Sequence, residues 1–149
     1  KEIYDKLVII YGETGITDKI AVRIKGQICE NAKMLSYVNV IPEMNHNEIV
    51  GWENNPQIFD NLFVLWLYDK NGQSANKNRF RITQNIFNKL KIEQFTLSFH
   101  DKIFFERFFH FINFGDWLSY WCAILHQTDP TPVEKILFLK EQLNSIKEI

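Results

Sequence analysis

The chain has 149 residues and a formal net charge of -1, and 46% of its residues are hydrophobic, which is enough for one domain with its own core. Its acidic and basic residues are balanced and well mixed, so no basic face is available for a phosphate backbone and nucleic acid binding is disfavoured. Cys29 and Cys122 lie far apart without CxxC spacing or a signal peptide, which is typical of reduced thiols in a cytoplasmic protein.

Short apolar runs alternate with helical patterns along the chain. The predicted strands cover residues 6–12, 36–42, 61–69 and 93–99, and the predicted helices cover 16–35, 46–54, 79–91, 102–125 and 132 onward. Nearly continuous apolar strands separated by helices indicate a doubly wound α/β domain, with a mostly parallel, flavodoxin-like sheet and helices on both faces. We therefore expect a single domain over residues 1–149.

A turn containing two glycines joins the first predicted strand to the first helix. Gly12 and Gly15 precede Thr17, the expected N-cap, at a place where backbone N–H groups can hold an anion. A G-x-x-G pair lacks the full dinucleotide or P-loop pattern, however. A tight structural turn is therefore the favoured interpretation.

The first predicted helix has an apolar stripe and a polar side. The apolar stripe consists of Ile20, Ile24, Ile28, Ala32 and Leu35. Glu30 falls on the other side, together with Arg23 and Gln27, so periodicity alone makes Glu30 a surface residue.

The polar segment after the second strand contains the only histidine that stands at a predicted helix start. Asn45 and Glu48 have the spacing of a capping box, which places His46 at the first position of the predicted helix over 46–54. The positive end of the helix dipole would favour its neutral imidazole, which can give and take protons. Because no HxxxH or HxH pair is present, a zinc site is disfavoured, and an ordinary capping loop remains the interpretation by residue type alone.

The segment over 102–125 holds many of the thirteen phenylalanines and looks at first like a membrane span. It is interrupted by Glu106, Arg107, His110 and Asp116. Because charges are costly in lipid, a buried helix of a soluble protein is favoured over a membrane protein. A helix this apolar needs cover on more than one face, and another chain or domain can supply part of that cover.

The last predicted helix begins with a second capping pattern, in which Thr131, Pro132 and Glu134 match N-cap, N1 and N3. On a helical wheel Lys140 lies near the middle of the apolar arc, whereas Lys135 lies toward its margin. A lysine in such an arc either extends its ammonium to solvent or faces a ligand, and the first arrangement is the commoner one.

A resemblance to a known family rests on three segments, which cover residues 21–33, 40–52 and 129–143. The first contains ENAK, the second contains PE-x-x-H-N, and the third ends in LKEQL. In that order and at that separation they resemble the C-terminal sugar isomerase (SIS) domain of the archaeal and bacterial bifunctional phosphoglucose/phosphomannose isomerases. The resemblance runs over nearly the whole chain, and ENAK followed by PE-x-x-H-N is its most specific part.

This resemblance implies isomerisation of glucose 6-phosphate and/or mannose 6-phosphate to fructose 6-phosphate through a cis-enediol, without a metal or organic cofactor. It implies that Glu30 is the base that moves a proton between C2 and C1, and that His46 helps to open the sugar ring of a neighbouring subunit in a homodimer. Lys140, with Lys135 as the alternative if the register differs, matches the active-site lysine near the C-terminus of the family.

The resemblance also implies a missing partner. In the family a serine- and threonine-rich loop of a preceding SIS domain binds the sugar phosphate, and this chain has no such segment. We therefore expect the chain to be the C-terminal half of a two-SIS-domain protein and to be inactive alone. The abrupt start of the sequence on an apolar strand agrees with this expectation. The alternative is a non-catalytic SIS module that binds a sugar phosphate or mediates dimerisation, and the residues encoded upstream would distinguish the two.

Overall fold

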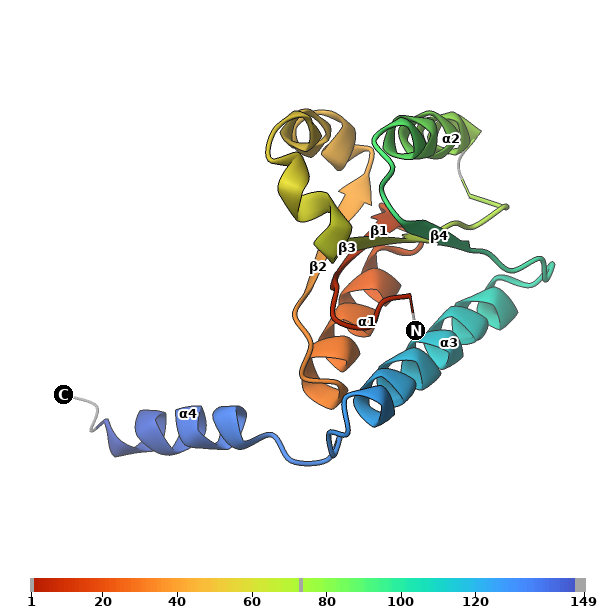
Figure 1. The fold of residues 1–149 in the computed structure, drawn as a ribbon. Coiled ribbons are helices and arrows are strands. Elements are labelled where there is room, and N and C mark those ends of the chain that lie inside the picture. Colours follow the sequence, from red (N-terminus) through yellow and green to blue (C-terminus); the bar gives the residue numbers. More distant parts are fainter. Residues whose placement is uncertain (1, 73, 147–149) are drawn as a thin grey trace.

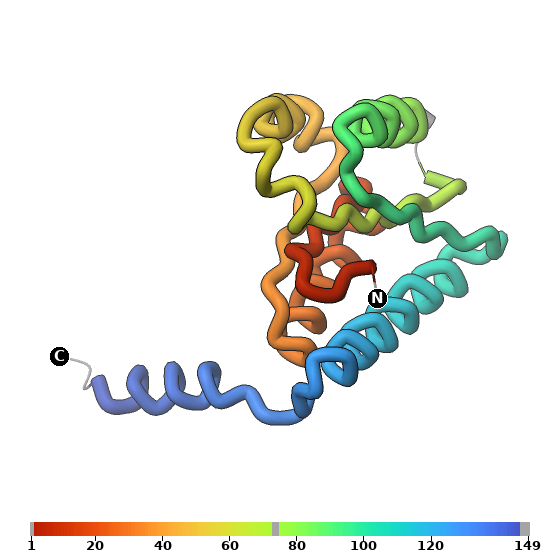
Figure 2. Tube along the Cα trace, viewed as in Figure 1, coloured from red at the N-terminus to blue at the C-terminus, as the bar shows by residue number. Residues whose placement is uncertain are grey.

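The computed structural model describes residues 2–72 and 74–146 (Figures 1 and 2). Within these residues one parallel sheet has the strand order β2-β1-β3-β4, formed by β1 (Leu7–Glu13), β2 (Ser36–Ile41), β3 (Leu62–Leu67) and β4 (Gln94–Leu97). β1 is central, because its Val8 lies opposite Ser36 of β2 and opposite Phe63 of β3. The predicted doubly wound α/β fold is confirmed.

Helices cover both faces of the sheet (Figure 1). One face is covered by α1 (Asp18–Asn31) and α3 (Phe104–Leu125). The other face is covered by α2 (Ser74–Lys89) and by short 3₁₀ helices named η1 (Glu43–Asn45), η2 (Glu48–Glu53) and η3 (Pro56–Asn61). The last helix, α4 (Glu134–Ser145), projects away from this body and has no buried residue.

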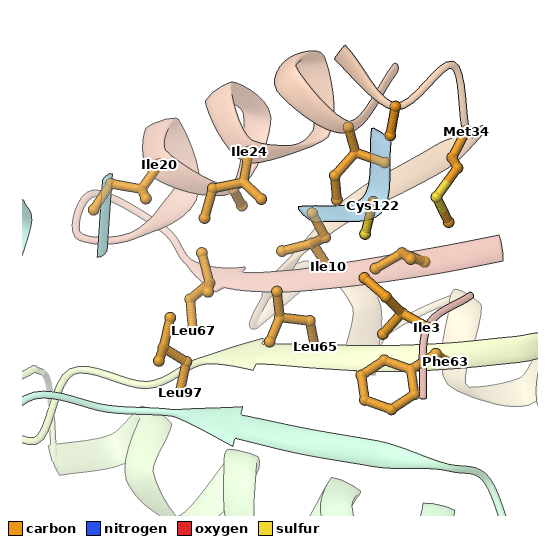
Figure 3. Packing of buried hydrophobic residues seen from close by; sticks show 14 of the residues in the cluster. Ile3, Ile10, Ile20, Ile24, Met34, Phe63, Leu65, Leu67, Leu97 and Cys122 are labelled. Atoms are coloured by element: carbon orange, nitrogen blue, oxygen red, sulfur yellow. The ribbon is translucent and has the colours of Figure 1, made fainter. Parts of the chain in front are cut away.

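The core between the sheet and α1 is mainly aliphatic (Figure 3). Ile20, Ile24 and Ile28 of α1 are buried against the sheet, as the apolar stripe predicted. The stripe was wrong only at its end, where Leu35 is 75% exposed. The reason is that α1 ends at Asn31, so the helical period no longer applies to Leu35.

The core on the opposite face is aromatic. Tyr11 and Trp66 stack with ring centroids 4.7 Å apart, and Phe87 lies 5.5 Å from the Trp66 ring. Trp52 of η2 packs on Phe87 with centroids 4.5 Å apart. These rings bury a large apolar area and attach the irregular segment between β2 and β3 to the sheet.

The Phe-rich helix α3 is buried on one face only. Arg107, Phe111, Gly115, Ser119, Cys122 and Ala123 face the interior, whereas Phe105, Phe109, Trp117 and Trp121 are exposed. The prediction of a buried helix is therefore right for half of its circumference. No described helix combines the length and the apolarity that crossing a membrane requires.

The start of α4 differs from the predicted capping box. The helix begins at Glu134 with Val133 as its N-cap, so Thr131 and Pro132 lie outside it. The reason is a competing local contact, because the Asp129 carboxylate accepts a hydrogen bond from the Thr131 N–H at 2.8 Å and holds these residues in a turn.

The contact between α1 and α3 depends on a glycine. A Cβ added to Gly115 would lie 2.5 Å from Cγ1 of Ile24. We expect Gly115→Ala to lower the free energy of unfolding by about 1–3 kcal/mol, as overpacking does. The matched control is Gly26→Ala on the outer side of α1, where no atom apart from the neighbouring residues and the helix's own backbone lies within 4 Å of the added Cβ. It should raise the free energy of unfolding by about 0.5–1 kcal/mol through helix propensity. Urea denaturation measures both, and equal effects would contradict this packing.

Candidate active site

Glu30 stands in the last turn of α1, at the edge of the sheet where the strands begin (Figure 1). It lies there because α1 runs back over the sheet between two parallel strands. Its side chain is exposed, as periodicity predicted, and its carboxylate makes no hydrogen bond or ion pair with residues 2–72 and 74–146. This carboxylate is therefore available to a ligand.

A groove with a volume of about 540 Å³ opens beside Glu30. One wall is the end of α1, with Cys29, Glu30 and Lys33. The other wall is the connection from α3 and the first turn of α4, with Thr128, Asp129, Pro132, Val133, Glu134, Lys135 and Ile136. The carboxylates of Glu30, Asp129 and Glu134 and the ammonium groups of two lysines thus line one concave surface.

The second wall of this groove is held in place by local hydrogen bonds. The Thr128 N–H donates to the Ala123 carbonyl at 2.9 Å, which ties the connection to the end of α3. Hydrogen bonds from Thr131 lower the pKa of the Asp129 carboxyl, and the nearby Lys33 ammonium lowers it further. Asp129 therefore accepts the Thr131 N–H as a carboxylate at neutral pH.

The two candidate lysines occupy different positions. Lys135 lines the groove that contains Glu30. Lys140 lies five residues further along α4, is exposed and does not line this groove. The helical wheel predicted an apolar face packed around Lys140, but Ile136 and Leu143 on that face are also exposed. The structure therefore brings Lys135, and not Lys140, to Glu30 within one chain.

In place of the predicted helix over 46–54 the structure has the shorter 3₁₀ helix η2, and the predicted capping box is wrong. The Asn45 side chain donates to the Thr83 hydroxyl at 2.8 Å, and the N-cap of η2 is Asn47, whose Oδ1 accepts the Glu48 N–H. His46 instead closes η1, with its N–H donating to the Glu43 carbonyl at 2.9 Å. His46 therefore does not stand at the N-terminus of a helix, and the predicted effect of a helix dipole on its imidazole is absent.

The segment that carries His46 is anchored to the sheet by Glu48. The Tyr11 hydroxyl donates to Oε1 of Glu48, and the Asn39 amide donates to its Oε2. Burial, followed by the Glu48 charge, raises the pKa of Tyr11, so its hydroxyl stays protonated and can donate. The His46 ring is exposed and makes no polar contact with the described residues. Tyr11 and Asn39 were not predicted as anchors, although a tyrosine in a buried strand signals a need for a hydrogen-bond partner.

Glu30 and His46 lie at opposite edges of the sheet. Glu30 precedes β2 and His46 follows it, and a six-residue strand spans roughly 17 Å. Figure 1 shows the end of α1 below the sheet and the 3₁₀ segment above it. One chain therefore does not bring the carboxylate and the imidazole together.

The edge where β1 and β3 end is filled by the chain's own polar groups. Glu13 is buried and accepts a hydrogen bond from the Asn76 amide at 2.9 Å. Asp69 and Arg107 form a buried ion pair with an N–O distance of 2.9 Å. In open α/β sheets ligands usually bind at this edge, near the switch in strand order. This cluster was not predicted, because its members are far apart in the chain.

In the glycine turn, polar groups of the chain itself also make the hydrogen bonds. The Thr17 hydroxyl accepts the Glu13 N–H at 2.8 Å and donates to the Leu67 carbonyl at 3.0 Å. Gly15 has a φ of 77°, and a Cβ at Gly12 would lie 2.9 Å from the Thr17 carbonyl oxygen. These contacts agree with a tight structural turn. Thr17 is the N-cap of α1 as predicted, but its side chain does not cap the helix.

Comparison with known proteins identifies the family. A model of the bacterial phospho-glucose isomerase C-terminal SIS domain matches residues 1–143. The chain belongs to this family. The predicted resemblance is thereby confirmed.

Relatives of this SIS domain are longer proteins. It is 40% identical over 147 residues to a bifunctional phosphoglucose/phosphomannose isomerase of Caldicellulosiruptor bescii, with 99% of this chain and 43% of that protein covered. A protein of the same name from Aquifex aeolicus is 34% identical over 141 residues, with 95% and 43% covered. The SIS domain thus spans less than half the length of these relatives.

A solved structure agrees with the fold of the SIS domain. Glucosamine-6-phosphate deaminase from Thermotoga maritima superposes with a TM-score of 0.56 at 11% identity, over 86% of this chain and 38% of that one. At this identity the likeness concerns the fold alone. Within the described part of the SIS domain, no three histidine, cysteine, aspartate or glutamate side chains are grouped so as to hold a metal ion.

The anchoring of the His46 segment can be tested through Tyr11. We expect Tyr11→Phe to lower the free energy of unfolding of the SIS domain by about 1–2 kcal/mol, because the partly buried Glu48 carboxylate loses a donor. Tyr4→Phe is the matched control, since Tyr4 is partly exposed and stacks on His126 through its ring alone. Urea denaturation followed by circular dichroism measures both variants. A Tyr11→Phe variant as stable as the Tyr4→Phe variant would contradict the anchoring role.

Proposed function

We propose that this SIS domain supplies the base and the ring-opening residues of an enzyme that converts glucose 6-phosphate and/or mannose 6-phosphate to fructose 6-phosphate. Its membership in a sugar-phosphate isomerase family supports the reaction class. The phosphate group is bound by an N-terminal SIS domain in the same longer protein, and the chain is inactive without it. The coverage of less than half of the relatives supports this division of roles.

The observation that carries the proposal is the carboxylate of Glu30, which has no partner among the described residues and lines a groove together with Lys33 and Lys135. Isomerisation through a cis-enediol needs one base that takes a proton from one carbon and returns it to the next on the same face. A carboxylate with no internal partner can do this, and it becomes more basic when substrate and a neighbouring domain exclude water. In this mechanism Glu30 moves the proton between C2 and C1.

A lysine of α4 stabilises the negative charge that develops on the sugar oxygens and assists ring opening. Lys140 is the proposed residue, and α4 brings it to the substrate by packing against the N-terminal SIS domain. The exposed apolar side chains of Leu137, Leu139 and Leu143 support such packing, since a helix that is free of contacts is only marginally stable. Lys135 is the alternative, because it already lines the groove beside Glu30. No metal or organic cofactor is needed for this chemistry.

His46 acts on the substrate held by a second copy in a homodimer. The separation of Glu30 and His46 across β2 supports this, since neither residue can reach the other's edge within one chain. β2 is an edge strand of the sheet, and an apolar hollow of about 410 Å³ lies beside it, lined in part by Leu35, Tyr37 and Ile58. A two-fold axis perpendicular to β2 would place the start of one β2 beside the end of the other, and so bring Glu30 to His46 of the second copy.

The role of Glu30 is tested in the two-domain protein. Glu30→Gln keeps the size and polarity of the side chain, so we expect the fold to be unchanged and isomerisation of glucose 6-phosphate to fall at least ~100-fold, the scale of a lost general base. Glu141→Gln, at an exposed position of α4, is the matched control and should be neutral. Near-normal turnover by Glu30→Gln would contradict the assignment of Glu30 as the base and favour a non-catalytic SIS module.

Action across the subunit interface is tested by mixing variants of the two-domain protein. A Glu30→Gln chain and a His46→Ala chain are each expected to be nearly inactive alone. In mixed dimers one of two sites regains both residues, so a 1:1 mixture should recover about one quarter of the wild-type activity after refolding together. Each variant refolded alone is the control. Absence of recovery would show that the two residues do not act together across the interface.

A further inference from the structure

The end of α1 breaks a local conformational rule. Lys33, one residue past the C-cap Ala32, has a φ of 57°. Helices commonly end with a residue in this left-handed region, but glycine is favoured there because a Cβ crowds the backbone. Lys91, just after α2, also has a φ of 59°, so the backbone angle alone assigns no role to Lys33, and the contacts of its side chain decide.

The side chain of Lys33 joins the two walls of the groove. Its ammonium donates to the Glu30 carbonyl at 2.5 Å on the α1 side. It also donates to the Pro130 carbonyl at 3.3 Å on the opposite wall. The two carbonyls lie 100 residues apart in the chain. Lys33 thus links the end of α1, which carries Glu30, to the connection that leads into α4.

Hydrogen bonds hold the connection on both sides of Pro130. The connection before Pro130 is tied to α3 through Thr128 and Ala123, and Asp129 accepts the Thr131 N–H. The same connection leads directly into α4, which carries Lys135 and Lys140. Movement of residue 130 relative to Glu30 would therefore change the spacing between the carboxylate and the lysines of α4.

We propose that Lys33 is a positioning residue that holds the end of α1 against the connection to α4 and so fixes Glu30 relative to the α4 lysines. The inference rests on the proposed function, in which Glu30 is the base. Lys33 acts through two backbone carbonyls and does not bind substrate. Its effect is therefore on turnover, because the base is displaced from the carbon-bound proton when the link is lost.

Two substitutions in the two-domain protein separate this role from a structural one. Lys33→Gly and Lys33→Met both remove the ammonium, but only Lys33→Gly relieves the left-handed backbone. We expect kcat to fall at least about 10-fold in both, with KM within about twofold of wild type. The Tm of Lys33→Gly should exceed that of Lys33→Met by about 2–4 °C. Lys33→Arg, which can donate to both carbonyls, should restore most of kcat.

Lys25→Met is the matched control, because Lys25 is exposed on the same helix and does not line the groove. It should leave kcat and KM unchanged. If kcat follows Tm instead, so that Lys33→Gly turns over like wild type, the positioning role is overturned. A 10-fold rise in KM at unchanged kcat would also overturn it, since Lys33 would then bind substrate.

Glu30→Gln, measured in parallel, distinguishes failure of this inference from failure of the proposed function. If Glu30→Gln is inactive while both Lys33 variants keep their kcat, only the role of Lys33 is wrong. If Glu30→Gln keeps normal turnover, the assignment of the base is wrong and the positioning role falls with it. A loss of kcat in Glu30→Gln, Lys33→Gly and Lys33→Met, with recovery in Lys33→Arg, supports both.

Discussion

The parallel pairing of β1 with β2 and β3 is the constraint on which the rest of this domain depends. A parallel connection must return the chain over one face of the sheet before the next strand begins. The end of α1 and the end of β2 are consequently forced to opposite edges. Chemistry that needs both Glu30 and His46 is thereby divided in space by backbone geometry, whichever side chains occupy the strands.

At the edge of the sheet where such folds usually bind ligands, buried polar side chains of the chain itself fill the space. The Arg107 guanidinium meets both carboxylate oxygens of Asp69 and also donates to the carbonyls of Asp101 and Lys102. Burying an ion pair is costly unless its hydrogen bonds are satisfied in this way. Glu13 lies against Gly72, where even a methyl group would clash with its carboxylate. This edge is a structural closure, whereas the carboxylate of Glu30 at the opposite edge has no partner among the described residues.

The elements that sequence predicted well are those governed by a local period. The apolar runs of β1 and β3 and the isoleucines of α1 reveal which faces are buried without any knowledge of a partner. Capping patterns were less informative, because Asn45 and Thr131 each found a different contact. Glu106 and Arg107 are both charged residues in the same apolar segment, so the sequence does not distinguish them. Only Arg107 is buried, and its partner Asp69 lies 38 residues away. For the site, Glu30 and His46 were singled out by family motifs, because nothing in their spacing distinguishes them physically. The link made by Lys33 depends on a backbone angle that no pattern of residue types encodes.

The uneven burial of α3 gives the domain two optically distinct sets of tryptophans. Trp52 and Trp66 are enclosed in the aromatic core, whereas Trp117 and Trp121 on α3 are 54% and 55% exposed. Indole emission shifts to shorter wavelength when water is excluded, so the core pair and the α3 pair emit at different wavelengths in the free domain. Any chain that comes to cover α3 changes only the second component. The domain therefore carries an intrinsic fluorescent reporter for occupation of that face, with an internal reference in its own core.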